Sequence, residues 1–191
     1  MNISLSWDLF IIVFFVVIIA YSFIIGRDNT LKVILGTYVS MVAADAGGNL
    51  FGEYFSGSAL FMKILKMAAV GNEEEAVIFV KVFLFVILVI LFAVKGAFEV
   101  STVDDRSAAI RMVLSMVYAF LSAGLIISAI LVFVSGGPFL ASGPEETGAA
   151  LWDIYNKSRL IRMMVTHSYL WFSLPALSFL IHSLYTRKSE E

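Results

Sequence analysis

An unbroken apolar run near the N-terminus most constrains what this chain can fold into. Residues 9–25 contain no charged residue, and most of them are Leu, Ile, Val or Phe. The summed free energy of transferring such a run into a bilayer is about −6 kcal/mol, so the segment inserts without help from the rest of the chain. Inside lipid, a single segment satisfies its backbone hydrogen bonds by forming a helix. The chain is therefore predicted to be a membrane protein.

Composition extends this prediction to the whole chain. Its 191 residues are 60% hydrophobic, which is more apolar surface than a soluble domain of this length can bury. The apolar runs are too long for barrel strands and do not alternate. We predict an all-α, polytopic membrane helical bundle that forms one domain over residues 1–191, with about five membrane-embedded helices and two amphipathic interfacial helices. The predicted spans are residues 9–25, 31–55, 76–97, 107–135 and 167–185, and the predicted interfacial helices are residues 57–69 and 147–164.

Charge, cysteine content and motifs exclude several kinds of function. A net charge of −2 argues against a nucleic-acid partner, and the absence of cysteine excludes disulfides and thiolate metal sites. The two histidines, His167 and His182, are too few for a histidine-rich site and are expected at the membrane interface. No hydrolase motif and no phosphate-binding loop occur in the sequence. We therefore expect no metal and no cofactor, and a membrane-embedded enzyme is only the third alternative.

Two stripes of small residues predict close helix packing. A spacing of four residues keeps such a stripe along one face of a helix, and in lipid small side chains let two helix backbones approach closely. We expect the first stripe to pack against residues 9–25 and the second stripe to pack against the first; a seam between copies of a homo-oligomer is the alternative. The first stripe comprises Gly36, Ser40, Ala44, Gly48 and Gly52, and the second comprises Ser115, Ala119 and Ala123.

One carboxylate, Asp45, interrupts the first stripe. Ionisable residues at membrane depth are costly and are usually functional, so Asp45 is a candidate proton or cation site. Tyr38 and Asn49 lie near the same helical face, where they either line a polar seam or simply satisfy the carboxylate structurally. Lys81, one turn into the next predicted span, is either a snorkelling lysine or the counter-ion of Asp45.

Local signals predict where the spans end and bend. Residues 26–30, Gly-Arg-Asp-Asn-Thr, are expected to form a short turn after the first span. Asn29 or Thr30 is suited to cap the following helix, because short polar side chains accept hydrogen bonds from the first free N–H groups. Pro175 is expected to kink the last span.

The distribution of basic residues predicts the orientation. Placing the basic groups that follow the first, third and last spans inside gives five crossings, with the N-terminus outside. The basic residues within 57–69 and 157–162 then lie outside, against the usual trend. The inside groups are Arg27 and Lys32, then Lys95, Arg106 and Arg111, and finally Arg187 and Lys188.

The order of these features resembles a known family. Asp8 opens an apolar span, Gly26-Arg27 closes it, and a second helix rich in glycine and alanine begins at Gly36. Over residues 5–135 this pattern resembles the colicin V production protein (CvpA) family, although the family typically reads Arg-Gly where this chain reads Gly-Arg-Asp. The resemblance implies a small bacterial inner-membrane protein that supports peptide-toxin export or envelope homeostasis.

These features together lead to two functional hypotheses. The first is an integral membrane protein in transport or export support, acting as a proton- or cation-linked component of a homo-oligomeric channel or transporter, with the bilayer and other copies of itself as partners. The second is a scaffold without transport activity, which recruits other proteins through its amphipathic helices. Ion flux in liposomes distinguishes the two hypotheses.

Overall fold

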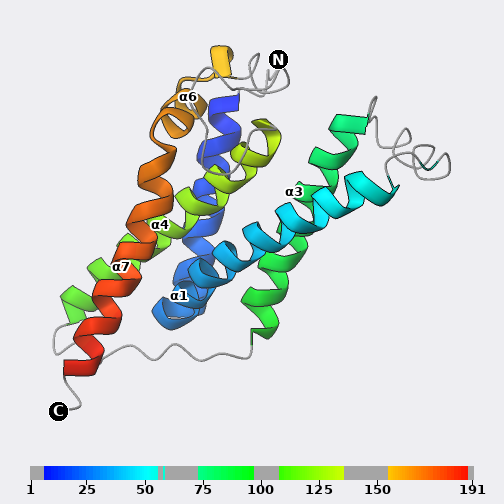
Figure 1. The fold of residues 1–191 in the computed structure, drawn as a ribbon. Coiled ribbons are helices and arrows are strands. Elements are labelled where there is room, and N and C mark those ends of the chain that lie inside the picture. The colour runs from blue at the N-terminus through cyan, green and yellow to red at the C-terminus, as the bar shows by residue number, and fades with distance from the viewer. Residues whose placement is uncertain (1–6, 56–57, 59–72, 97–107, 136–154, 189–191) are drawn as a thin grey trace.

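Helices make up nearly all of the described structure, which confirms the all-α class (Figure 1). The computed structural model describes residues 7–55, 58, 73–96, 108–135 and 155–188. Within these ranges three helices are long and apolar enough to cross a membrane, or four if α6 and α7 form one bent span. The predicted interfacial helix at 57–69 lies outside the described residues. The helices are α1 (Trp7–Phe55), α3 (Glu73–Lys95), α4 (Ala108–Ser135), α6 (Arg159–Thr166) and α7 (Ser168–Lys188).

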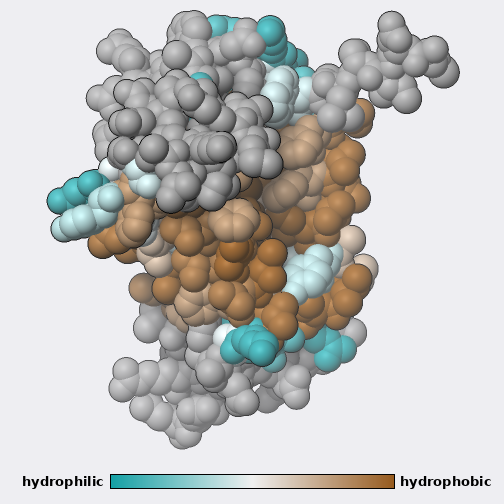
Figure 2. All heavy atoms as spheres, turned by 90° about the vertical axis from the view of Figure 1, so that its right-hand side faces the viewer, coloured by the Kyte–Doolittle hydropathy of each residue, from teal (hydrophilic) through white to brown (hydrophobic). Residues whose placement is uncertain are grey.

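A broad apolar band covers the exterior of the bundle. Figure 2 shows apolar side chains across the middle of one face, with hydrophilic residues near its upper and lower ends. On water-soluble proteins a patch of this extent marks an association surface, whereas lipid accepts it as an ordinary exterior. The band is therefore compatible with membrane insertion. On α3 its exposed side chains are Phe79, Phe83, Val86, Ile87, Ile90, Leu91 and Val94.

The long helix α1 breaks at a single residue, Gly26. Its backbone has φ 81° and ψ 172°, a conformation that is essentially restricted to glycine. The predicted turn over residues 26–30 is thus shorter than expected, because helical geometry resumes at Arg27. Figure 1 shows that the two arms of α1 diverge sharply after the break. We call Trp7–Ile25 the first arm and Arg27–Phe55 the second arm.

Asn29 and Thr30, the two predicted capping residues, do not form an N-cap, because their side chains donate hydrogen bonds at the break instead of accepting them. Asn29 Nδ2 donates to the Ile25 carbonyl at 2.8 Å, and Thr30 Oγ1 donates to the Gly26 carbonyl at 2.8 Å. Thr30 Oγ1 also lies 3.2 Å from the Ser22 carbonyl, eight residues earlier. An N-cap side chain accepts hydrogen bonds from N–H groups, whereas these side chains donate to carbonyls in the last turn of the first arm and at Gly26.

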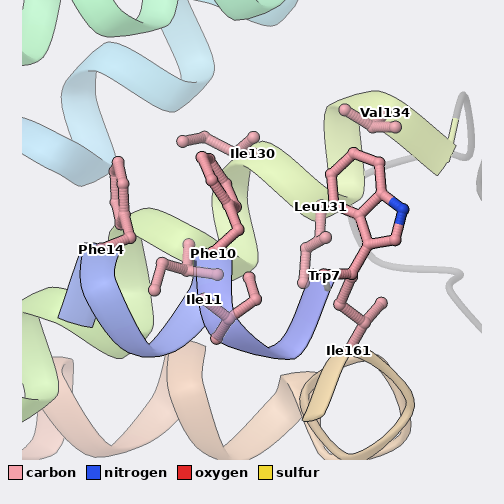
Figure 3. A pocket seen from close by; sticks show the side chains of 9 residues that line it. Trp7, Phe10, Ile11, Phe14, Ile130, Leu131, Val134 and Ile161 are labelled. Carbon is pink, nitrogen blue, oxygen red and sulfur yellow. The ribbon is translucent and has the colours of Figure 1, made fainter. Parts of the chain in front are cut away.

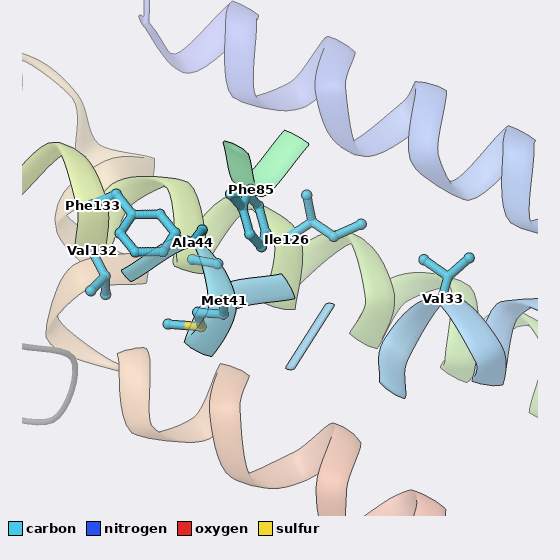
Figure 4. Close-up of a cluster of buried hydrophobic side chains, with 8 residues drawn as sticks. Val33, Met41, Ala44, Phe85, Ile126, Val132 and Phe133 are labelled. Carbon is cyan, nitrogen blue, oxygen red and sulfur yellow. The ribbon is translucent and has the colours of Figure 1, made fainter. Parts of the chain in front are cut away.

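Helix α4 lies at the centre of the bundle. In the most apolar 18-residue stretch of α4, 78% of the residues are buried inside the protein. In the most apolar stretches of the same length in α1 and α3, only 11% are buried. Three consecutive α4 residues, Leu125, Ile126 and Ile127, belong to three different hydrophobic clusters. Because consecutive helical residues point about 100° apart, this division means that other helices surround this part of α4. Figure 4 shows the cluster in which Ile126 lies near Met41 and Phe85.

The glycines of the first stripe pack against α3, so the predicted partner, the segment 9–25, is wrong. At each of these glycines an added Cβ would meet an α3 side chain, which shows how closely the two helices approach. At the far end of the seam, Lys32 Nζ donates to the Gly96 carbonyl at 3.0 Å. The order of the contacts makes the second arm and α3 antiparallel. The contacting pairs are Gly36 with Phe92, Gly48 with Lys81, and Gly52 with Val77.

The C-terminal part consists of the short helix α6 and the longer helix α7. Of the predicted interfacial helix at 147–164, residues 155–157 are helical, Ser158 interrupts the helix, and α6 begins at Arg159; residues 147–154 lie outside the described residues. A bend of 61° separates α6 from α7 at His167, ahead of the predicted kink site. Pro175 itself is buried inside α7. Helix α7 packs on α4 where Trp171 lies against Gly124, a position at which an added Cβ would come within 2.0 Å of the indole.

Candidate functional site

An ion pair joins the second arm of α1 to α3. Lys81 Nζ lies 2.7 Å from Asp45 Oδ1, so the counter-ion alternative describes the structure better than a snorkelling lysine. Asn49 Nδ2 lies 3.4 Å from the other carboxylate oxygen, Asp45 Oδ2, one helical turn further along α1. Three of the four predicted site residues therefore meet. Both oxygens of one carboxylate face a hydrogen-bond donor.

Gly48 makes room for this ion pair. A Cβ at position 48 would lie 2.2 Å from Lys81 Cγ and 3.0 Å from Lys81 Cε. The aliphatic part of the lysine therefore passes directly over the glycine before its ammonium reaches Asp45, one turn earlier on the same helix. The small-residue stripe was predicted only as a packing seam. Here it also creates the space in which the counter-ion lies.

The two charged groups differ in exposure. The Lys81 side chain is 17% exposed, whereas the Asp45 side chain is 42% exposed. Pairing an ammonium with a carboxylate compensates part of the cost of removing both from water, and that cost rises steeply in an apolar medium. Part of the Asp45 carboxylate is therefore exposed on the outside of the chain, where molecules around the protein can contact it.

Tyr38 does not join this cluster. Its hydroxyl donates to the Phe172 carbonyl of α7, one turn before Pro175. The expectation that Tyr38 shares a polar seam with Asp45 is wrong, because its side chain reaches α7 instead.

The remaining stripe residues are buried within the chain, except Ser115, which is half-buried. Ala44 is fully buried in the hydrophobic cluster that links α1, α3 and α4, and Ser40 is fully buried with no hydrogen-bond partner for its hydroxyl. On α4, Ala119 and Ala123 are fully buried, and the Ser115 hydroxyl donates to the Arg111 carbonyl at 2.9 Å. Because both alanines are fully buried inside the chain, neither offers a contact surface to a second copy.

Sequence reasoning missed a second polar contact, which joins the first turn of α1 to α6. The Ser158 hydroxyl and the Leu160 backbone N–H both donate to Asp8 Oδ1. Ser158 also caps α6, because its Oγ accepts from the Ile161 N–H at 3.1 Å. A serine placed just before an amphipathic run is an N-cap signal that could have marked this position. This contact places the basic residues of α6 beside the start of α1.

Among the described residues, no group of histidine and acidic side chains is arranged to hold a metal ion. His167 Nδ1 lies 3.0 Å from the Met163 carbonyl, at the bend between α6 and α7. The Asp45 cluster itself consists of one ion pair and one side-chain hydrogen bond. Comparison with known proteins adds no assignment, since no family model, curated protein or solved structure matches the chain.

Proposed function

We propose that this chain crosses a bacterial inner membrane five times, with its N-terminus outside and its C-terminus inside. The proposal treats the two arms of α1 as separate crossings. The first arm has 19 residues and is about 28 Å long at 1.5 Å per residue, close to the thickness of a bilayer's hydrocarbon core. Helices α3 and α4 and the α6–α7 unit supply the other crossings. The resemblance to the CvpA family implies the same location.

We further propose that the protein acts in transport or export support, with the Asp45–Lys81 pair as a proton- or cation-responsive centre. One observation carries this proposal: the pair lies inside an apolar helix contact, yet its carboxylate stays partly exposed. Lys81 lies eight residues, or about 12 Å, from Glu73 and fourteen residues, or about 21 Å, from Lys95. If α3 crosses the bilayer, the pair lies within the apolar layer.

The energetics favour a functional origin for this pair. Apolar residues of similar volume often stabilise a fold as well as a buried ion pair does, so packing alone does not require the pair. A carboxylate that faces outward from the chain at this depth needs a further polar neighbour, such as water, a permeating cation or a second copy of the chain. A homo-oligomer that encloses the open side of Asp45 meets this need, and oligomerisation is part of the proposal.

Flux into liposomes tests the proposal directly. Asp45→Asn keeps the shape of the side chain and removes its titration, so pH-dependent proton or cation flux should fall to the level of empty liposomes. Glu53→Gln is the matched control, since it removes an exposed carboxylate two turns further along the same helix and should leave flux unchanged. Both proteins are checked for helicity and for oligomeric state before reconstitution.

A charge exchange separates transport from a purely structural role. In the double variant Asp45→Lys with Lys81→Asp, the opposite charges still face each other across the α1–α3 contact. A structural role predicts that stability and any activity recover together in this variant. The transport role predicts recovered stability without recovered flux. Wild-type protein with no flux above empty liposomes, or flux that survives in well-folded Asp45→Asn, contradicts transport and favours the scaffold hypothesis.

A further inference from the structure

A basic depression opens where the first turn of α1 meets α6. Its volume is about 570 Å³, and side chains of residues 156–167 form most of its lining. The cationic side chains among them are Lys157, Arg159 and Arg162. The lining also includes one acid, Asp8, whose carboxylate already accepts hydrogen bonds from Ser158 and from the backbone of α6. The depression therefore carries an excess of positive charge that suits an anionic ligand.

An apolar groove lies between the same helices and α4. Figure 3 shows this groove, whose volume is about 150 Å³ and whose lining is entirely apolar. Trp7 and Ile11 come from α1, Leu131 and Val134 from α4, and Ile161 from α6. Apolar cavities of this size stay dry and accept small apolar groups. The groove is therefore suited to part of a hydrocarbon chain rather than to a polar molecule.

The depression and the groove are direct neighbours along the chain. Trp7 lines the groove while the next residue, Asp8, lines the depression. Likewise, Ile161 lines the groove, and the next residue, Arg162, lines the depression. Because adjacent helical residues point about 100° apart, the two hollows lie on adjoining sides of α6 and of the first turn of α1. A ligand with an anionic end and an apolar end can engage both.

We propose that this junction binds an anionic phospholipid, with its phosphate against Arg159 and Arg162 and part of one acyl chain in the groove. Guanidinium groups bind phosphate through paired hydrogen bonds, which a lysine cannot match in geometry. Arg162 is held in place, since it lies 5.5 Å from the centre of the Tyr155 ring and donates to the Asn156 carbonyl at 3.1 Å. A guanidinium has five N–H donors, so this bond leaves others for a phosphate.

The surroundings of the junction match the membrane interface, where phospholipid headgroups lie. Helix α6 is short and amphipathic and buries Ile161 and Met164, as expected for a helix that lies along the interface. Trp7 is 44% exposed at the start of an apolar arm, a typical position for interfacial tryptophan. With the N-terminus outside, the basic cluster would oppose the positive-inside trend. Binding of lipid phosphate gives these cations a reason to lie there.

Native mass spectrometry of the full chain in detergent tests the proposal, with dioleoyl phosphatidylglycerol and dioleoyl phosphatidylcholine as probes. The wild-type protein should bind the anionic lipid at least tenfold more tightly than the zwitterionic lipid. Each cation near an anionic headgroup contributes about fivefold to affinity, so Arg159→Gln with Arg162→Gln should weaken phosphatidylglycerol binding about 25-fold. Arg111→Gln is the matched control, because it removes an exposed arginine in the first turn of α4, at the opposite end from Leu131 and Val134, and should bind as the wild type does.

Three results would overturn the proposal: equal affinity for both lipids, a loss in Arg111→Gln as large as in the double variant, or equally tight binding of glycerol phosphate, which would indicate a free-anion site. Val134→Trp provides an independent test, since it fills the groove and keeps every cation. It should weaken binding of the diacyl lipid while binding of a headgroup analogue stays as in the wild type. If the double variant fails to fold, the wild-type lipid preference and the groove variant still decide the question.

Discussion

Gly48 and Lys81 approach so closely that no side chain larger than hydrogen fits between them. A Cβ at position 48 would lie 2.2 Å from Lys81 Cγ. Lys81 reaches Asp45 only across this space, so the packing of α1 on α3 and the ion pair depend on the same glycine. A substitution at position 48 therefore affects both at once.

Gly48→Ala should destabilise the protein by about 1–3 kcal/mol, the usual cost of overpacking a tight contact. Thermal unfolding in detergent measures the change. Gly47→Ala is the matched control, because its added methyl meets only the end of the Leu84 side chain, at 3.0 Å, which can move aside. Equal melting temperatures for the two variants would mean that the close contact at Lys81 does not constrain the fold.

Gly26→Ala should destabilise the protein by about 1–3 kcal/mol through the backbone alone. No atom lies within 4 Å of an added Cβ at this position, so steric contact does not contribute, whereas φ of 81° is unfavourable for alanine. Gly26→Asn should not recover the loss, since asparagine tolerates a left-handed φ only with ψ near 47°, far from the observed 172°. A wild-type melting temperature for Gly26→Ala would show that the break in α1 is not needed.

Ser158→Ala should cost about 1 kcal/mol, the usual loss of an N-cap, and should raise amide hydrogen exchange throughout α6. Ser173→Ala removes an exposed hydroxyl from α7 and should leave both measurements unchanged. Asp8→Asn combined with Ser158→Ala completes a double-mutant cycle. A coupling free energy indistinguishable from zero would argue against the contact between the two side chains.

Tyr38→Phe should lower stability by about 0.5–1.5 kcal/mol, because it removes the hydroxyl that bonds to the α7 backbone. It should leave liposome flux unchanged, because this residue lies apart from the Asp45 cluster. Tyr54→Phe, at a site that is 70% exposed, should change neither quantity. Loss of flux in well-folded Tyr38→Phe would place the tyrosine in the transport path after all.

The helices themselves follow from the sequence because apolar runs in lipid have few alternatives to helix. Helices α3, α4 and α7 lie close to their predicted ranges of 76–97, 107–135 and 167–185. The partners of these helices do not follow in the same way. A stripe of small residues shows that some helix approaches closely, but it contains no information about which one. The glycines of α1 could be assigned to α3 only from three-dimensional packing.

The candidate site shows the same division between local and distant contacts. Asn49 lies one turn from Asp45, so their contact follows from helical spacing alone. Lys81 is 36 residues away, and its contact depends on how α1 and α3 align. Tyr38 has suitable helical spacing, yet its side chain extends to α7. Position on a helix face limits which residues can meet, whereas the arrangement of the neighbouring helices decides which do.

The central position of α4 has a consequence for biosynthesis. Both arms of α1 and all of α3 leave the ribosome before the helix around which they pack. Proteins are generally folded from the N-terminus as they are made, so the early helices must hold open, or later re-form, the space that α4 occupies. Helix α7 follows last and covers α4 at Gly124 with Trp171. A chain truncated before α4 therefore lacks the helix on which the earlier helices pack. A chain truncated after α4 lacks α7, so the side of α4 at Gly124 stays uncovered.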